Sequence, residues 1–213
     1  MQISETIRAM LPELTEWRQA LHRHPETAFE EHRTAAFIAH ELRAMGLEVH
    51  EGLAGTGVVG VLRNGEGWSV GLRADIDALD ITEATGLPYA SQVPGKMHAC
   101  GHDDHTTMLL GAARAMAANP TGQGTVVFIF QPAEENEGGA RVMLEDGLFD
   151  RFPVDQVYSL HNWPGLAAGR FAVHAGPVMA ALPQLDRRAT GNRPCSELEG
   201  RPAAFAVRIL AGA

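Results

Sequence analysis

The chain has 213 residues, 17 basic and 26 acidic side chains, a formal net charge of −9 and 45% hydrophobic residues. This length allows one domain or most of two, and the composition is that of an ordinary soluble globular protein. The negative charge argues against nucleic acid or an anionic membrane surface as a partner. No run approaches the roughly 20 apolar residues that a membrane-spanning helix needs.

Export and disulfide formation are not indicated. The first ten residues, MQISETIRAM, contain an early glutamate and no apolar run, so we do not expect a secretory signal. The two cysteines, Cys100 and Cys195, lie far apart in the chain. Such cysteines, without an export signal, are more often free thiols in a reducing compartment than a disulfide pair. We therefore expect a cytoplasmic protein.

Local signals mark the ends of several elements. The first helix has Ser4 as its N-cap and stops before Pro25, and the second ends at Gly46, which suits the left-handed conformation after a helix. NGEG, residues 64–67, is typical of a hairpin turn between two strands. The helix after the histidine-rich segment is capped by one of the pair Asp103–Asp104.

Hydrophobic periodicity predicts helices and strands that alternate along the chain. The predicted elements, in chain order, are helices over residues 3–24 and 30–46, strands over 47–52, 56–63 and 68–77, a helix over 104–119, a strand over 124–135, a helix over 138–149 and a strand over 154–164. This alternation predicts an α/β fold with a central sheet flanked by helices.

Polar side chains stand at the carboxyl ends of three predicted strands. In open α/β sheets, functional sites form beyond these ends. Each of the polar residues would be costly to bury unpaired within the sheet, and at the strand ends they can converge on one cleft. They are Asp75 and Asp77, Glu134 and Glu135, and His161.

The segment GKMHACGHDDHTTM, residues 95–108, adds metal-ligand types to this edge. Cys100 and His102 are two residues apart, so in an extended segment their side chains leave on the same side. A thiolate, imidazoles and a carboxylate suit zinc, manganese, cobalt or nickel better than magnesium or calcium. Of the adjacent Glu134 and Glu135, one can hold metal while the other deprotonates an attacking water.

Seven motifs together resemble the metal-dependent N-acyl-amino-acid amidohydrolases. In chain order they read WRQALHRHPETAFEE, GTGVVG, LRADIDAL, MHACGHDDHTTMLLGAA, QPAEENEGGA, SLHNWP and GPVMA. This family includes hippurate hydrolases and the plant hydrolases of auxin–amino acid conjugates, and it is related to dizinc carboxypeptidases. The resemblance implies a two-metal aminopeptidase/carboxypeptidase-like catalytic domain, interrupted by a smaller lid domain through which family members form homodimers.

The resemblance also implies roles for individual residues. Cys100 resembles the ligand that bridges two divalent metal ions, and His102 resembles a terminal ligand. Glu135 resembles the next ligand, Glu134 the general base, and His161 a ligand of the second metal. The reaction implied is hydrolysis of the amide bond of a small N-acyl amino acid by a metal-activated water.

Other candidates have a supporting role, and plainer interpretations exist. Asp75, Asp77 and His105 are candidates for side chains that orient the ligands from behind. Taken alone, Cys100 could be a small buried hydrophobe, and His161 could be a core histidine with ordinary hydrogen bonds.

The resemblance stops after GPVMA, near residue 180. Residues 181–213 are rich in arginine and proline and lack periodicity before their last apolar run. We therefore expect residues 1–180 to be the N-terminal part of the catalytic domain and 181–213 to be a divergent tail, out of frame or disordered. On this expectation the lid domain and the C-terminal part of the catalytic domain are absent.

Activity is expected to suffer as a result. All ten histidines lie at or before His174, whereas the family takes one further ligand histidine from a later segment. We expect hydrolysis to be lost or impaired in this chain. Two alternatives remain open: a non-catalytic remnant that at most binds metal, and a dipeptidase or carboxypeptidase on the same scaffold.

Overall fold

A computed structural model describes residues 4–120 and 122–173 and the backbone of residues 205–211. The helices are α1 Glu5–Arg23, α2 His32–Ala44, α3 His102–Ala118, α4 Gly139–Glu145 and α5 Leu148–Arg151. The strands are β1 Glu48–Leu53, β2 Gly57–Asn64, β3 Trp68–Asp75, β4 Gly124–Gln131, β5 Gln156–Asn162, β6 Phe171–Val173 and β7 Phe205–Ala211. Among the described residues, no helix combines the length and the apolar content needed to cross a bilayer.

The ends of the first two helices follow from their capping residues. The Ser4 hydroxyl oxygen accepts a hydrogen bond from the Ile7 N–H at 3.3 Å, so Ser4 is the N-cap of α1. This helix ends at Arg23, before Pro25. Gly46 has φ +82° after α2, the left-handed conformation in which glycine meets no steric cost. These three predictions are confirmed.

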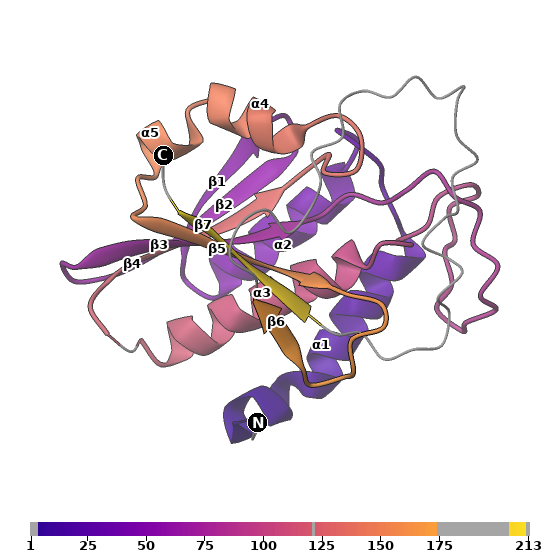
Figure 1. Cartoon of the computed structure of the whole chain (residues 1–213), viewed down its shortest axis with the longest axis horizontal. Coiled ribbons are helices and arrows are strands. Elements are labelled where there is room, and N and C mark those ends of the chain that lie inside the picture. Colours follow the sequence, from indigo (N-terminus) through magenta and orange to yellow (C-terminus); the bar gives the residue numbers. More distant parts are fainter. Residues whose placement is uncertain (1–3, 121, 174–204, 212–213) are drawn as a thin grey trace.

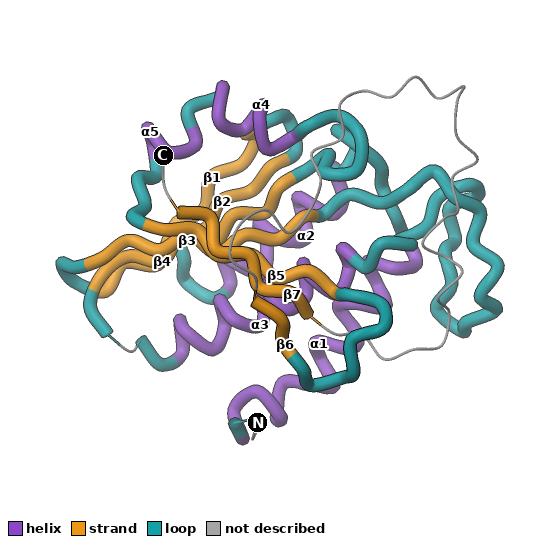
Figure 2. Tube along the Cα trace, in the orientation of Figure 1, coloured by secondary structure: helices purple, strands orange, loops and turns teal. Residues whose placement is uncertain are grey.

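One sheet forms the centre of the fold, with strand order β1-β2-β4-β3-β5-β7-β6. Strand β3 is parallel to both β4 and β5, whereas β1 is antiparallel to β2 and β2 to β4. Figures 1 and 2 show the strands between two sets of helices. The predicted α/β fold with a helix-flanked sheet is confirmed. Because β3, β4 and β5 run in the same direction, their carboxyl ends meet at one edge of the sheet.

Two hydrophobic clusters lie on opposite faces of the sheet. In β4, Phe128 and Phe130 point to the face covered by α1, α2 and α3, where Ile38 and Leu42 are also buried. Val127 and Ile129 of β4 point to the face covered by α4 and α5. This alternation is the side-chain period of two that a strand imposes. The sheet is therefore buried on both faces over its central strands.

The predicted hairpin at residues 64–67 is wrong. β2 and β3 follow each other in the sequence, but β4 lies between them and pairs with both. The chain does reverse direction at these turn residues. The position between β2 and β3 is occupied by β4, whose two faces are both apolar. A strand that is apolar on both sides is stabilised most in the middle of a sheet that has helices on both faces.

Three predicted boundaries also need correction. The helix predicted over residues 138–149 is two helices, α4 and α5, because Gly147 adopts φ +81° between them. β4 ends at Gln131, so the two glutamates lie in the turn that follows and not in the strand. β3 ends at Asp75, two residues before the predicted end.

The last apolar run of the predicted tail forms β7. This strand is antiparallel to β5 and parallel to β6. Residues 181–204 lie outside the described residues, so the division of the chain at residue 180 stays a prediction.

The two-face core gives a first testable prediction. Leu42 is fully buried between α2 and the sheet, whereas the Leu144 residue on α4 is 51% exposed. Leu42→Ala should lower the free energy of unfolding by about 2–5 kcal/mol, since it removes buried apolar contacts and leaves a cavity. Leu144→Ala, the same change at an exposed site, should cost less than about 0.5 kcal/mol. Urea unfolding of both variants measures the difference, and equal losses would contradict this description of the core.

Candidate metal centre

The carboxyl edge of the sheet collects the site residues expected from the sequence. Asp75 is the last residue of β3, the two glutamates follow β4, and His161 lies near the end of β5. Cys100 lies in the segment that leads into α3. Four stretches that are distant in sequence therefore meet at the same place.

The start of α3 differs from the prediction. The helix begins at His102, its N-cap is Gly101 in the left-handed conformation at φ +92°, and no side chain of the described residues caps it. The segment from Cys100 to His102 is therefore not extended, and the predicted aspartate cap is wrong. Gly101 is needed on two counts, since a Cβ there would also lie 2.8 Å from the Asn162 side-chain nitrogen. The turn at Gly101 directs the Cys100 and His102 side chains to the same cluster.

His102 is oriented by Asp77. Its Nδ1 lies 2.9 Å from the Asp77 carbonyl oxygen and 3.1 Å from Asp77 Oδ1, so Nδ1 carries a hydrogen and donates it. The other ring nitrogen, Nε2, is buried and has no hydrogen-bond partner among the described residues. A histidine whose Nδ1–H donates to a carboxylate and whose Nε2 is free has the form in which imidazole binds metals.

Cys100, His102 and Glu135 form an open cluster. Their ligand atoms lie within 4.8 Å of one another, and His102 Nε2 is 3.7 Å from Glu135 Oε1. Both of these atoms are buried, and neither has a hydrogen-bond partner in the described part of the chain. A buried polar atom without a partner costs about 1–3 kcal/mol, and a cation between them would remove that cost. Sulfur, nitrogen and oxygen donors together fit a zinc-like ion.

His161 approaches the cluster from β5. Its Nδ1 lies 2.6 Å from the Asn162 carbonyl oxygen, and its Nε2 lies 3.6 Å from Cys100 Sγ. The sulfur therefore has His102 near it in the cluster and His161 beside it on another element. This arrangement allows one thiolate to face two cations.

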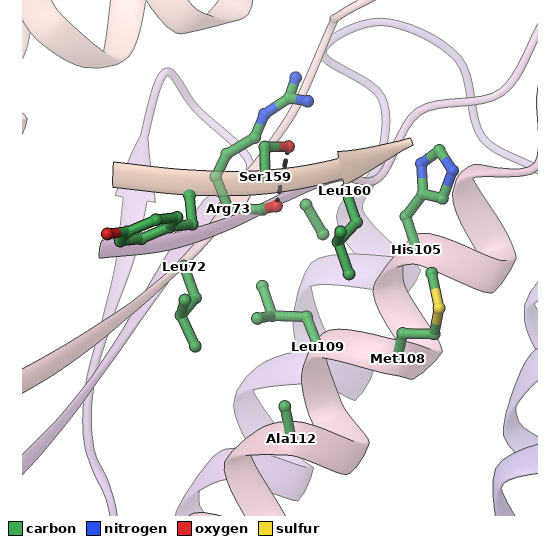
Figure 3. Close-up of a pocket in the computed structure, with 10 residues that line it drawn as sticks. Leu72, Arg73, His105, Met108, Leu109, Ala112, Ser159 and Leu160 are labelled. Atoms are coloured by element: carbon green, nitrogen blue, oxygen red, sulfur yellow. Dashed lines mark hydrogen bonds between the residues drawn. The ribbon is translucent and has the colours of Figure 1, made fainter. Parts of the chain in front are cut away.

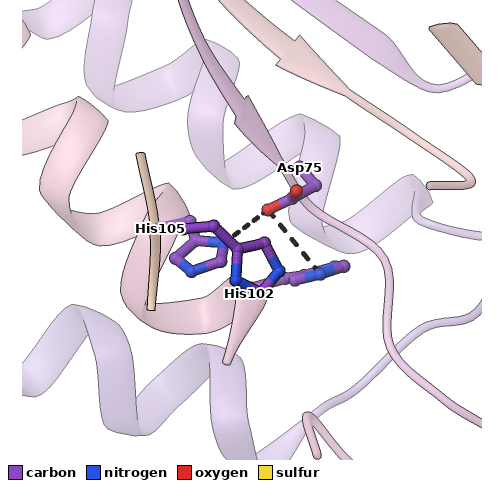
Figure 4. A group of neighbouring side chains, drawn as sticks. Asp75, His102 and His105 are labelled. Atoms are coloured by element: carbon purple, nitrogen blue, oxygen red, sulfur yellow. Dashed lines mark hydrogen bonds and ion pairs between the residues drawn. The ribbon is translucent and has the colours of Figure 1, made fainter. Parts of the chain in front are cut away.

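His105 belongs to a second group, with Asp75, His102 and His161, whose ligand atoms also lie within 4.8 Å of one another. Figure 4 shows Asp75 facing both His102 and His105. His105 Nδ1 donates to Asp75 Oδ1 at 2.6 Å, and its Nε2 accepts from the Asn162 N–H at 3.0 Å. Both ring nitrogens of His105 thus have protein partners, which favours a supporting position over direct ligation.

A strained turn presents the two glutamates. Glu134 Oε2 lies 4.0 Å from His102 Nε2, and its side chain is 29% exposed, so solvent reaches it. Glu135 is held by its backbone, since its N–H donates to Asp77 Oδ2 at 3.0 Å. The preceding Ala133 has φ +52°, a left-handed conformation that costs a residue with a side chain about 1–2 kcal/mol.

Burial raises several pKa values in the cluster. It raises the pKa of the Cys100 thiol to about 11. It also raises the pKa values of the Glu134 and Glu135 carboxyls, because removal from water disfavours their charged forms. The cluster is thus poised to exchange protons for a cation.

The pKa values of His102 and Asp75 are shifted by charged neighbours, against the effect of burial. Burial disfavours the imidazolium of His102, but Asp75 and Asp77 outweigh it and hold its pKa well above the usual value. Burial likewise opposes ionisation of Asp75, but Arg73 and His102 outweigh it and hold its pKa well below the usual range. The Cys100 thiol therefore carries a proton at neutral pH that a cation must displace, so metal affinity should rise with pH.

Two neighbouring features lie outside the cluster. His98 is buried, burial lowers its pKa to about 4, and neither ring nitrogen has a partner within the described residues. A cavity of about 240 Å³ lies between β3, β5 and α3, with His105 on its wall. Figure 3 shows that Leu109 and Ala112 line it, while the Arg73 guanidinium points away from them. The cavity is apolar and does not contain the candidate ligands.

Sequence patterns did not reveal three residues that support the site. Glu31 accepts a hydrogen bond from the Ala133 N–H, Arg73 pairs with Asp75 at 2.7 Å, and Asn162 contacts His105. All three stand inside motifs quoted above, so their presence was visible but their contacts were not.

Comparison with known proteins identifies the family. A sequence profile of peptidase family M20/M25/M40 matches residues 71–209, well over half of the chain. The chain belongs to this family. Hippurate hydrolase of Campylobacter jejuni is 44% identical to the M20 chain over 182 residues, which cover 85% of the chain and 47% of that protein. N-acetyl-L-cysteine deacetylase of Bacillus subtilis is 46% identical over 167 residues, or 78% of the chain and 40% of that protein.

A solved M20 structure supports the fold. The Bacillus subtilis YXEP protein, described as a dinuclear metal-binding peptidase of the M20 family, matches with a TM-score of 0.72 and 42% identity. The match covers 76% of the chain and 46% of that protein. The chain thus spans less than half the length of each of these relatives. The resemblance drawn from the motifs and the two-metal peptidase type of fold are confirmed.

Metal content tests the cluster directly. We expect the purified chain to retain a divalent ion, and we expect Cys100→Ala and His102→Ala to lose most of it, since each removes one donor of the cluster. His40→Ala, which removes an exposed histidine of α2, is the matched control and should keep the ion. Elemental analysis after dialysis gives the stoichiometry. Equal metal in all four proteins would overturn the assignment.

Proposed function

We propose that this protein hydrolyses the amide bond of N-acyl amino acids with a metal-activated water. The observation that carries the proposal is the Cys100, His102 and Glu135 cluster, which has two buried atoms without hydrogen-bond partners among the described residues and Glu134 beside it. Membership of a family of metal-dependent hydrolases supports the reaction type. The relatives named hippurate hydrolase and N-acetyl-L-cysteine deacetylase support the substrate class.

The cluster residues would hold two divalent ions. Cys100 would bridge them as a thiolate, His102 and Glu135 would hold one ion, and His161 would hold the other. When bound, such ions supply Lewis acidity toward the amide carbonyl and toward the attacking water. Zinc fits this donor set, and manganese, cobalt and nickel are the alternatives.

Glu134 would act as the general base. It lies near His102 without a bond to it, and it is partly exposed, so a water can reach its carboxylate. Burial raises its pKa, and a carboxylate with a raised pKa holds a proton more readily in mid-reaction. Glu134 would take a proton from the attacking water and pass it to the nitrogen of the leaving amine as the C–N bond breaks.

Three buried residues would orient the ligands. Asp77 holds both the His102 ring and the Glu135 amide, so it would fix two ligands of the same ion. Asp75 and His105 are hydrogen-bonded to each other next to His102 and His161, and they would set the position of those rings.

The context of the reaction is part of the same proposal. A thiolate ligand must stay reduced, which favours a compartment such as the cytoplasm. The partner is a small substrate, and a homodimer through a lid domain follows from the family resemblance. A dipeptidase or carboxypeptidase would use the same cluster. The rates of hydrolysis of hippurate and of an unblocked dipeptide, measured side by side, distinguish such a peptidase from an N-acyl-amino-acid hydrolase.

The chain of 213 residues is expected to turn over slowly on its own. It contains no histidine after His174, and the resemblance assigns one further ligand histidine to a later segment. An incompletely held ion would be poorly placed, and small misplacements of reacting groups are costly in rate. Turnover is therefore best measured in an extended form, in which the C-terminal half of Campylobacter jejuni hippurate hydrolase follows the chain.

The two glutamates should differ in what they contribute. In the extended form, Glu134→Gln should keep its metal and lose turnover of hippurate by about 10²–10⁴-fold, since it removes a base without removing a ligand. Glu135→Gln should lose metal as well, because a neutral amide is a poorer donor. Metal content and turnover are measured on the same samples. The reverse pattern would exchange the two roles, and full turnover by Glu134→Gln would refute the proposed mechanism.

A further inference from the structure

Glu31 is a glutamate in the interior of the protein. It stands at the start of α2 and is fully buried. It does not cap its own helix, because the Arg33 and Thr34 N–H groups at the start of α2 donate to the Glu26 carboxylate instead. A carboxyl group removed from water needs partners, so its contacts indicate what it holds in place.

Both carboxyl oxygens of Glu31 accept hydrogen bonds from distant parts of the chain. Oε2 accepts from the Thr56 hydroxyl at 2.6 Å, between β1 and β2. Oε1 accepts from the Ala133 N–H at 2.9 Å. Ala133 directly precedes Glu134, so Glu31 connects the start of α2 to the turn that presents the two glutamates.

This turn depends on such contacts. Ala133 is fully buried in a left-handed conformation, which residues with a side chain rarely adopt. Its carbonyl oxygen accepts from the Gly139 N–H at 2.9 Å. Gly139 can come this close because it has no Cβ, which would lie only 1.9 Å from the Pro132 oxygen. Glu31 and Gly139 together bind both backbone polar groups of Ala133.

We propose that Glu31 is a positioning residue that clamps the Ala133 amide and thereby aims the Glu134 and Glu135 carboxylates at His102. Those carboxylates now lie 4.0 Å and 3.7 Å from His102 Nε2. Without the acceptor, the buried Ala133 N–H loses its hydrogen bond. Rotation of the turn to a right-handed conformation then removes both the cost of the unpaired N–H and the cost of the left-handed backbone. That rotation turns both carboxylates away from the cluster.

The catalytic part of this inference rests on the proposed function, whereas the clamp itself does not. Two substitutions distinguish the effect of the length of the Glu31 side chain from the effect of its negative charge. Glu31→Gln keeps the length, since its oxygen accepts from Ala133 and its amide nitrogen donates to the Thr56 hydroxyl. Glu31→Asp keeps the charge but is one methylene shorter and cannot reach both partners. A clamp predicts that Gln is the better replacement, and a role as a buried charge predicts the opposite.

The experiment measures amide hydrogen exchange at Ala133 and zinc affinity in the chain itself. Glu31→Asp and Glu31→Ala should exchange the Ala133 amide at least about tenfold faster, because local opening becomes easier. They should also bind zinc about 10–100-fold more weakly, as expected for lost support of a metal ligand. Glu31→Gln should stay close to the unchanged chain in both measurements. In the extended form, Asp should lower kcat for hippurate more than it raises KM.

Glu30 provides the matched control. It is the exposed neighbour of Glu31 and pairs with Lys96 at 2.6 Å, away from the turn. Glu30→Asp and Glu30→Ala should leave exchange at Ala133 and zinc affinity unchanged. If Glu31→Ala does not fold, the comparison of Asp with Gln decides the question. Unchanged exchange in Glu31→Asp, or equal damage in Gln and Asp, would overturn the clamp. Absence of hippurate turnover in the extended form would overturn the proposed function. Hydrogen exchange at Ala133 and zinc affinity would still test the clamp.

Discussion

The carboxylate of Asp77 joins two segments that carry the candidate metal ligands. Oδ1 lies 3.1 Å from His102 Nδ1, and Oδ2 accepts from the Glu135 N–H at 3.0 Å. Asp77 is itself anchored, because the preceding Ile76 is fully buried and its N–H donates to the Gln131 carbonyl oxygen. One buried carboxylate thus sets the separation between an imidazole and a carboxylate, and it ties both to the edge where the parallel strands end.

The residues around this site lower the free energy of unfolding of the protein. In the part of the chain that the structure describes, His102 Nε2 and Glu135 Oε1 are buried without hydrogen-bond partners, and Ala133 is held in a left-handed conformation. Each feature costs on the order of 1–3 kcal/mol, which is large against the marginal stability of a domain. The apolar clusters on both faces of the sheet offset it, since they bury the central strands away from the edge. The strained backbone and the unpaired polar atoms therefore lie at the edge of the sheet where a metal ion and a substrate would bind.

Sequence patterns located the elements better than their connections. Amphipathic helices such as α2 are visible because one face is apolar, but nothing in residues 64–67 shows that β4 inserts between β2 and β3. Polar residues after apolar strands stand out, so Glu134 and Glu135 could be predicted as site residues. The start of α3 was misplaced because a left-handed Gly101 takes the place of a side-chain cap. Glu31 was missed, although it stands in helical register with the buried Ile38 and Leu42, because its partner Ala133 is distant in sequence.

X-ray absorption at the zinc edge tests the central claim, that a buried thiolate of the Cys100, His102 and Glu135 cluster holds the metal. For the zinc-loaded chain, we expect a sulfur scatterer at about 2.3 Å together with nitrogen and oxygen scatterers at about 2.0–2.2 Å. The sulfur shell should vanish in Cys100→Ala, which separates Cys100 from the other cysteine of the chain. A spectrum of the unchanged chain that contains nitrogen and oxygen neighbours alone would mean that Cys100 is not a ligand.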